Sequence, residues 1–242
     1  MSSSMASKMP SWLEFPTFWL STASQRDPVW HSQRTYRLTC SNFGSAAGHN
    51  MFCSPEELAD DLSGIKKKTR DEKALKIMQY GTDMEPFARK WYEEKHKANV
   101  VEIGLAIPKW NTRIGGSVDG LVTSSDPQGI VEIKCPMSMY KPLKNYTASL
   151  ASGWKPPQNY HEHIWTSHYD QMMGCMAIVG APWCDYLVYC EEEDNAFEQR
   201  IPFDQEYWEG DLYPKVKSFI ENLLDPRLKQ RGIEVKEFDP KK

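Results

Sequence analysis

The chain has 242 residues, of which 40% are hydrophobic and 26% are charged, and its net charge is −4. This composition is ordinary for a globular protein with one core, and we expect a single domain over residues 1–242. No apolar run approaches the roughly 18 residues that a membrane helix requires. The acidic balance argues against a passive nucleic-acid coat, which would be basic overall.

The two ends of the chain and the cysteines point to an intracellular, soluble protein. Residues 1–11 are rich in serine and methionine and lack the hydrophobic centre of a signal peptide, so we expect a flexible tail. The polar residues 226–242 are expected to form a second tail. The six cysteines include no CxxC pair, which favours reduced thiols over disulfides or an iron–sulfur cluster.

The first half of the chain reads as mainly helical. The aromatic-rich residues 12–20 are expected to pack on the surface of the core, and a short helix is expected after Thr39. Ser54, followed by a proline and two glutamates, is a strong helix start, and that helix should end at Gly64. Two more helices are predicted, separated by a break or kink at Gly81 and Pro86, over residues 71–80 and 82–97.

From residue 99 the pattern changes to β-structure. Three strands are predicted, at residues 100–107, 113–122 and 130–135. After them we expect a long Pro-rich loop, a helix, a hairpin and an amphipathic helix, at residues 148–160, 163–179, 186–201 and 204–224. This order predicts an α/β fold in which a mixed central β-sheet is flanked by helices.

The most informative stretch, residues 115–136, brings two carboxylates and a lysine together. Residues i and i+2 of a strand share a face, so Glu132 and Lys134 project to the same side. The polar turn at 123–129 folds the flanking strands into a hairpin, which places Asp119 beside Glu132. Carboxylates hold hard cations and an ammonium stabilises a developing phosphorane, so the set predicts Mg²⁺-dependent phosphodiester hydrolysis. The alternative is a salt bridge on an edge strand.

Three helical residues are candidates to support this set. Glu85 lies beside the predicted kink and would complete a metal shell, although alone it reads as an exposed helical acid. Gln171 lies on an otherwise apolar helix face, where an amide is costly unless it is hydrogen-bonded, and it would bind the scissile phosphate or the attacking water. Tyr169 would stack or hydrogen-bond nearby.

A second group of candidates would bind phosphate. Arg34, Thr39 and Ser41 form a cationic and hydroxyl cluster at a helix start, and Ser117 shares a face with Asp119. Local basic stretches are Lys66 to Lys68 with Arg70, Lys141, Lys144 and Lys155, each of which taken alone reads as a solvated face. The three histidines His161, His163 and His168 fit no standard zinc spacing.

In order, these motifs resemble those of the PD-(D/E)xK nuclease superfamily, and more narrowly the lambda-exonuclease and YqaJ viral-recombinase family. The resemblance covers roughly residues 30–225 and implies a restriction-endonuclease-like core. Its motifs are an arginine with Thr-x-Ser, Gly-x-x-x-Glu-Pro, Ser-x-Asp-Gly, Glu-x-Lys-Cys-Pro and Tyr-x-Gln, which begin here at Arg34, Gly81, Ser117, Glu132 and Tyr169. Val118 stands where the family has a proline before its first acidic residue, which is Asp119 here.

The resemblance implies a Mg²⁺-dependent exonuclease with a two-metal site, in which Mn²⁺ would substitute. Its substrate would be a double-stranded DNA end, digested 5′→3′ to leave a 3′ single-stranded tail for recombination or end repair. Implied partners are a single-strand annealing protein and further copies of the chain, in a trimer. If the protein is viral, its compartment is the host cytoplasm or nucleus.

The resemblance also implies roles for individual residues. The metal ligands would be Asp119, Glu132 and the carbonyl of Ile133, with Glu85 assisting. Lys134 would position or activate the water, and Gln171 would support the site. The DNA and its 5′-phosphate would contact Arg34, Thr39, Ser41, Ser117 and Tyr169.

Three other functions stay open at this stage. A structure-specific or single-strand endonuclease, or a nuclease that also cuts RNA, would use the same core and is distinguished by its activity on closed circular DNA. A non-catalytic DNA-end-binding scaffold is disfavoured by the intact Asp119, Glu132 and Lys134. A docking partner of an annealing protein is the third.

Overall fold

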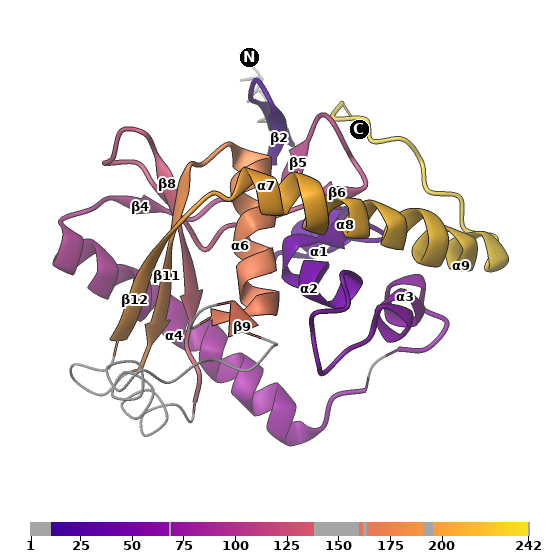
Figure 1. The fold of residues 1–242 in the computed structure, drawn as a ribbon, viewed down its shortest axis with the longest axis horizontal. Helices are drawn as coiled ribbons and strands as arrows, with labels where there is room; N and C mark the ends of the chain where they lie inside the picture. Colours follow the sequence, from indigo (N-terminus) through magenta and orange to yellow (C-terminus); the bar gives the residue numbers. More distant parts are fainter. Residues whose placement is uncertain (1–10, 68, 138–159, 162–163, 191–195, 242) are drawn as a thin grey trace, which may run out of the picture.

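The computed structural model describes residues 11–67, 69–137, 160–161, 164–190 and 196–241. Its centre is a five-stranded β-sheet with the order β12-β11-β8-β7-β4 (Figure 1). The strands are β4 (Val100–Val101), β7 (Gly120–Val122), β8 (Gly129–Lys134), β11 (Trp183–Tyr189) and β12 (Ala196–Pro202). Because β8 and β11 pair in parallel and the other pairs are antiparallel, the sheet is mixed. The predicted fold class is confirmed.

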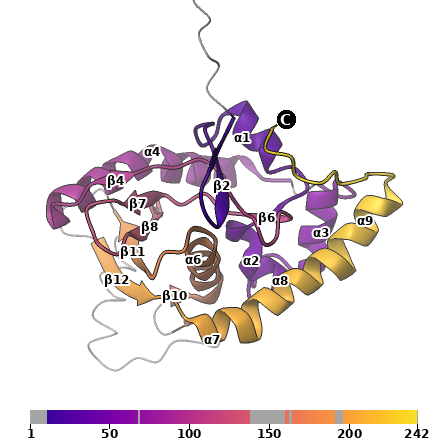
Figure 2. The same ribbon diagram turned by 90° about the horizontal axis from the view of Figure 1, so that it is seen from above.

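Two helices cover opposite faces of this sheet, α4 (Glu72–His96) on one and α6 (Thr166–Val179) on the other (Figure 2). Alternate residues of β8 follow this division. Val131 and Ile133 pack in one cluster with α4, whereas Ile130 packs in the cluster that contains α6. Glu132 and Lys134 share the face of Ile130, so the strand's period of two directs both charged side chains toward α6.

The predicted helix start at Ser54 is confirmed. Helix α3 (Pro55–Ser63) has a capping box between Ser54 and Glu57, and it ends at Gly64, whose φ of +72° is left-handed. The prediction of two separate helices is wrong, because α4 runs through both Gly81 and Pro86. A proline removes one hydrogen bond from the helix, whereas the apolar face of α4 is buried against the sheet over several turns and outweighs that loss.

Two of the three predicted strands divide between sheets. Residues 100–107 give β4 in the central sheet and the start of β5 (Ala106–Pro108), which joins a sheet of order β1-β2-β5 with β1 (Trp12–Glu14) and β2 (Phe18–Ser21). Residues 113–122 likewise give β6 (Ile114–Gly115), paired with β3 (Leu38–Thr39), and β7. The aromatic N-terminal segment is therefore a hairpin whose Trp12 and Phe18 are buried, and not only a surface covering.

The C-terminal residues are more ordered than predicted. A continuous helical run from 205 to 230 alternates α-helix and π-helix, in α7 (Gln205–Tyr207), η2 (Trp208–Leu212), α8 (Tyr213–Phe219), η3 (Ile220–Leu224) and α9 (Asp225–Gln230). The tail predicted at 226–242 is corrected, because it begins inside α9 and later packs Phe238 against Trp12 with ring centroids 4.9 Å apart. The remaining elements are α1 (Pro28–Gln33), η1 (Cys40–Asn42), α2 (Phe43–Ala46), β9 (Tyr160–His161) and β10 (Ile164–Trp165).

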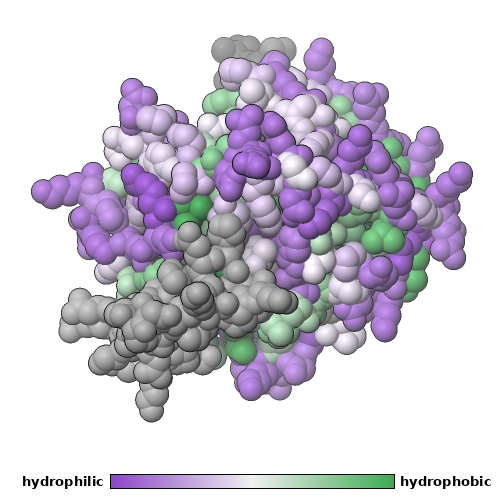
Figure 3. Space-filling model, viewed as in Figure 1, coloured by the Kyte–Doolittle hydropathy of each residue, from purple (hydrophilic) through white to green (hydrophobic). Residues whose placement is uncertain are grey.

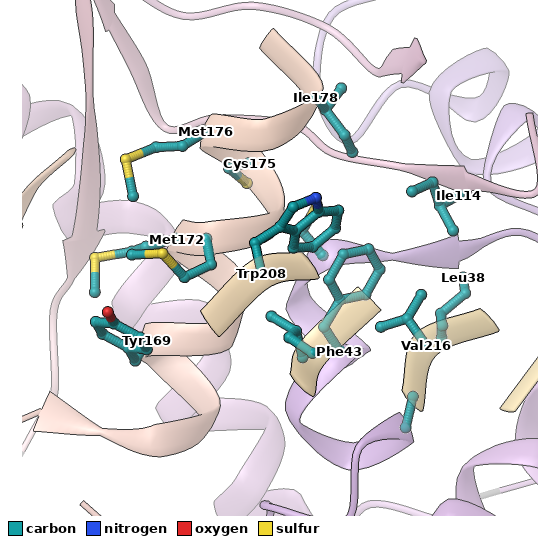
Figure 4. Packing of buried hydrophobic residues seen from close by; sticks show 14 of the residues in the cluster. Leu38, Phe43, Ile114, Tyr169, Met172, Cys175, Met176, Ile178, Trp208 and Val216 are labelled. Carbon is teal, nitrogen blue, oxygen red and sulfur yellow. The ribbon is translucent and has the colours of Figure 1, made fainter. Parts of the chain in front are cut away.

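The main core lies between α6, α2 and the C-terminal helices (Figure 4). The predicted hairpin is confirmed as β11 and β12, although its turn at 191–195 and most of the predicted loop at 148–160 lie outside the described residues. The face shown in Figure 3 is largely hydrophilic, with small separate hydrophobic patches. Among the helices that the structure describes, none is long and apolar enough to cross a membrane.

Candidate active site

The site begins where β7 and β8 lie side by side. Asp119 directly precedes β7, and the antiparallel register pairs Gly120 with Val131. Asp119 Oδ2 accepts a hydrogen bond of 2.8 Å from the backbone N–H of Ile133. The predicted hairpin is confirmed, and it places Asp119 at the edge of the strand that carries Glu132.

Glu132 is the most deeply buried member, with 1% of its surface exposed. Its Oε1 accepts hydrogen bonds from Lys134 Nζ and Gln171 Nε2, each at 2.5 Å. Lys134 Nζ also donates to Gln171 Oε1 at 3.2 Å, which closes a triangle between β8 and α6. The second carboxylate oxygen of Glu132, Oε2, is buried and has no hydrogen-bond partner among the described residues.

Burial and mutual repulsion shift the pKa values of this cluster. Burial and then the charge of Glu132 raise the pKa of Asp119 to about 7. Burial also raises the pKa of Glu132, and the charge of Lys134 opposes this shift. Burial lowers the pKa of Lys134, but the two carboxylates outweigh it and the net shift is upward. Lys134 is therefore an ammonium ion at neutral pH and serves as a fixed positive charge.

Glu85 reaches the same edge from α4, but between two arginines. Burial and then Asp119 raise the pKa of Glu85, whereas both arginines lower it. Its Oε1 accepts from Arg89 at 3.0 Å, and its Oε2 contacts Arg26. Sequence reasoning missed both arginines. Arg89 follows Glu85 by four residues on one helix face, a spacing that predicts their contact. Arg26 is 59 residues from Glu85 in the sequence, so no local pattern predicts their contact.

The donor atoms at this edge suit a hard divalent cation. The N–H and C=O of one strand residue point to the same edge, so the Ile133 carbonyl shares the side of its N–H, toward Asp119. With the unpartnered Oε2 of Glu132, this gives an all-oxygen set. Within the described ranges, no group of three or more His, Cys, Asp and Glu side chains could hold a metal ion. Mg²⁺ needs no such group, since it is typically held by one or two carboxylates together with water and substrate phosphate.

The predicted phosphate cluster is brought together around a tryptophan. Arg34 donates to Thr39 Oγ1 at 3.2 Å, and Thr39 Oγ1 lies 3.3 Å from Ser41 Oγ. The guanidinium of Arg34 lies 4.1 Å from the centroid of the Trp30 ring, and burial lowers its pKa. Trp30 Nε1 donates to Ser117 Oγ at 2.9 Å. Trp30 thus joins Ser117 to the cluster. Its position four residues before Arg34 could have indicated that the two side chains lie on one helix face.

Other predicted residues lie differently. Tyr169 is 3% exposed and packs edge-on to Tyr207 at 5.3 Å, so the structure places it in the core, not on a DNA-facing surface (Figure 4). His168 Nδ1 lies 2.8 Å from the Tyr186 hydroxyl, and burial and Lys134 lower its pKa to about 3, which keeps it neutral. Of the predicted basic stretches, the residues that the structure describes lie on the loop between α3 and α4: Lys66, Lys67 and Arg70. Outside the described residues lie Lys68, Lys141, Lys144, Lys155 and His163, together with the side chain of His161.

Comparisons with known proteins agree with the fold described above. An alkaline exonuclease from Laribacter hongkongensis, LHK-Exo, is 24% identical with a TM-score of 0.63, over 84% of this chain and 97% of that chain. The same figures hold for its complex with dAMP. A phage-related exonuclease from Haemophilus somnus 129PT is 14% identical with a TM-score of 0.53, over 81% of this chain and 95% of that chain. These likenesses confirm the fold.

No curated protein sequence matches the chain significantly. The sequence profile of the YqaJ-like viral recombinase domain, however, matches residues 29–182, which is more than half of the chain and contains the five motifs in order. The resemblance drawn from those motifs is confirmed. The chain belongs to the YqaJ-like viral recombinase domain family.

Proposed function

We propose that this protein is a divalent-metal-dependent DNA exonuclease that hydrolyses the 5′-ended strand of a duplex end. The observation that carries the proposal is the state of Glu132. One of its oxygens is held by Lys134 and Gln171, while the other is buried and has no hydrogen-bond partner among the described residues. Glu132 also lies close enough to Asp119 for the two charges to interact. A buried carboxylate oxygen without a donor is costly, and a cation with substrate phosphate would relieve that cost. The YqaJ-like family and the neighbours named exonucleases support the same activity.

Each residue of the site has a definite task in this proposal. Asp119, Glu132 and the Ile133 carbonyl hold the metal, which when bound lowers the pKa of water and stabilises the leaving oxygen. Lys134, kept as an ammonium by the two carboxylates, places positive charge where negative charge develops on the phosphate. Gln171 fixes Lys134 and Glu132 in one geometry through both ends of its amide.

The tryptophan-centred cluster would hold the 5′-phosphate of the end. Arg34 supplies the charge, Ser41 and Ser117 supply hydroxyl groups, and the buried Thr39 orients the guanidinium. Glu85 would turn to the cation when the site fills. A 3′ single-stranded product, a single-strand annealing partner and assembly into a trimer complete the proposal and come from the family resemblance alone.

The test is digestion of a 5′-phosphorylated linear duplex in Mg²⁺, in Mn²⁺ and in chelator, beside nicked and closed circles. We expect release of mononucleotides from 5′ ends only with metal, and intact closed circles. Lys134→Ala should abolish digestion. Lys95→Ala is the matched control, because Lys95 also contacts a carboxylate, Glu198, but on the edge strand β12. It should digest as the wild type does.

Two results would overturn the proposal in different ways. Cutting of closed circles would make the protein an endonuclease on the same core. If the folded wild type cuts no substrate with any divalent metal but still binds DNA ends, it is a binding scaffold.

A further inference from the structure

Arg26 precedes α1 and lies outside the residues matched by the family profile, yet its side chain reaches the active site. The turn that carries it is fixed on both sides. Gln25 Nε2 donates to the carbonyls of Ile103 and Val118, each at 3.0 Å. Asp27 then caps α1 through the N–H of Val29 at 2.7 Å.

The backbone of Arg26 itself is strained. Its φ of +69° lies in the left-handed region, which is unfavourable for a residue with a Cβ. Such strain persists only where the surroundings hold it, and it concentrates at functional sites. Here the Gln25 contacts and the Asp27 cap hold the turn in the one conformation that aims Arg26 at Glu85.

The two arginines that contact Glu85 differ in their other contacts and in their exposure to solvent. Arg89 also contacts Glu102 at 3.0 Å and the carbonyl of Asp119 at 3.0 Å, and its side chain is 14% exposed. Arg26 contacts Glu85, and 42% of its side chain is exposed. Arg89 is therefore held within the fold by several contacts, whereas Arg26 has a partly exposed side chain at the rim of the site.

The charges of the site favour a change of partner for Arg26. Glu85 lies beside Asp119, so it is drawn to any cation that Asp119 and Glu132 hold, and the attraction that keeps Arg26 in place then weakens. A bound DNA strand brings backbone phosphates to the same rim. A guanidinium binds phosphate through two parallel hydrogen bonds, which a lysine in this position does not match.

We propose that Arg26 binds a backbone phosphate of the DNA strand in the active site, and that it leaves Glu85 to do so when a divalent cation is present. This inference rests on the proposed function. It assigns a substrate contact to the N-terminal turn, which is held by Gln25, by Asp27 and by the carbonyls of Ile103 and Val118.

The test measures DNA binding without relying on cleavage. The affinity of a fluorescent 5′-phosphorylated duplex is followed by anisotropy in Ca²⁺, which replaces Mg²⁺ to limit cleavage, and in EDTA, over a salt series. Arg26→Ala should weaken binding about tenfold in Ca²⁺ and reduce the slope of log affinity against log salt by about 0.9. In EDTA the loss should be smaller, because Arg26 then remains on Glu85.

Two further variants sharpen the test. Arg26→Lys keeps the charge, so it should restore the salt slope and part of the affinity. Arg227→Ala is the matched control, because Arg227 also pairs with a carboxylate, Asp60 at 2.6 Å, but on α9 at the other end of the molecule (Figure 1). It should bind DNA as the wild type does, and thermal melting should show that all variants are folded.

The outcomes separate this inference from the proposed function. If Arg26→Ala binds DNA with wild-type affinity and salt slope while the wild type digests DNA, the inference is wrong and the proposed function stands. Lost digestion with unchanged binding also overturns it, because Arg26 would then only position Glu85. A wild type that neither binds nor digests DNA ends would instead overturn the proposed function.

Discussion

Two buried carboxylates on neighbouring strands, Glu132 of β8 and Asp185 of β11, differ in how their oxygens are hydrogen-bonded. Asp185 is 6% exposed and accepts a hydrogen bond on Oδ1 from Arg200 at 2.8 Å. On Oδ2 it accepts from Arg200 at 2.8 Å and from Tyr92 at 2.6 Å. Glu132 is more deeply buried, and both of its donors, Lys134 and Gln171, share one oxygen.

The difference shows that burial of charge does not by itself mark a functional site. Asp185 accepts hydrogen bonds on both oxygens from groups of α4 and β12, so it links a helix to an edge strand. Glu132 retains, at the end of the hairpin, an oxygen with no hydrogen-bond partner in the part of the chain that the structure describes. We therefore expect Asp185 to serve stability and Glu132 to serve activity. Two measurements test this division, and two more test the neighbours of Glu132.

The largest effect is expected from Glu132→Gln. The change removes a charge from the proposed metal site and keeps the shape of the side chain, so digestion of a linear duplex should fall by roughly 10²- to 10³-fold or more. The melting temperature should change little. A variant that keeps wild-type activity would remove Glu132 from the mechanism.

Asp185→Asn should show the reverse pattern. It weakens three hydrogen bonds to a charged acceptor, with a loss of stability of about 2 kcal/mol and a fall in melting temperature of about 4–8 °C. Activity per folded molecule should be retained. Arg200→Gln keeps the Tyr92 contact and should destabilise less. A large loss of activity in folded Asp185→Asn would contradict the comparison.

Gln171→Leu tests whether the amide organises the pair that it joins. Lys134 and Glu132 remain, but nothing fixes their relative geometry from α6, so kcat should fall about 10- to 100-fold. The metal concentration needed for half-maximal activity should rise as well. An unchanged kcat would show that the β8 contact between Lys134 and Glu132 suffices without α6.

The smallest effect concerns pH in chelator. The pKa of Asp119 is raised to about 7 from a usual value of 3.8, so between these limits the folded protein binds a proton more tightly than the unfolded chain. Stability contributed by this group is therefore present at low pH and is lost as pH rises toward 7. Asp119→Asn should melt a few degrees above the wild type at pH 8, at roughly 2–4 °C for each kcal/mol, and this gap should narrow at pH 5 and close only below the usual pKa of 3.8. A gap that does not change with pH would contradict the assignment.

Local rules explain the features that were predictable from the sequence. Capping chemistry located α3 at Ser54 and Gly64, and the period of two in β8 placed Glu132 and Lys134 on one face. The order of the motifs identified the family before any fold was known. Local rules failed at Pro86, where burial of the apolar face of α4 outweighs one lost hydrogen bond, so the helix continues.

Close backbone packing decided the splitting of the predicted strands. A Cβ on Gly104 would lie 2.5 Å from the carbonyl oxygen of Ser21, and one on Gly116 would lie 2.8 Å from the sulfur of Cys40. At Gly104 the chain passes from the central sheet to the β1-β2-β5 sheet, and at Gly116 it passes from the β3-β6 pair to the central sheet. Each glycine permits a contact with a segment far away in the sequence. No periodicity within residues 100–122 contains that information.

The sequence by itself determined which residues share a strand face and where α3 begins and ends, because these depend on neighbours a few positions apart. It also determined which family the chain belongs to, because the family's motifs can be recognised in order along the chain. Only the tertiary structure decided that Gln171 closes the triangle with Glu132 and Lys134, that Trp30 joins Ser117 to Arg34, and that Arg26 reaches Glu85. Each of these contacts depends on how α1, α4 and α6 pack around one sheet edge. Packing is a property of the whole core, so it is set by many distant side chains together.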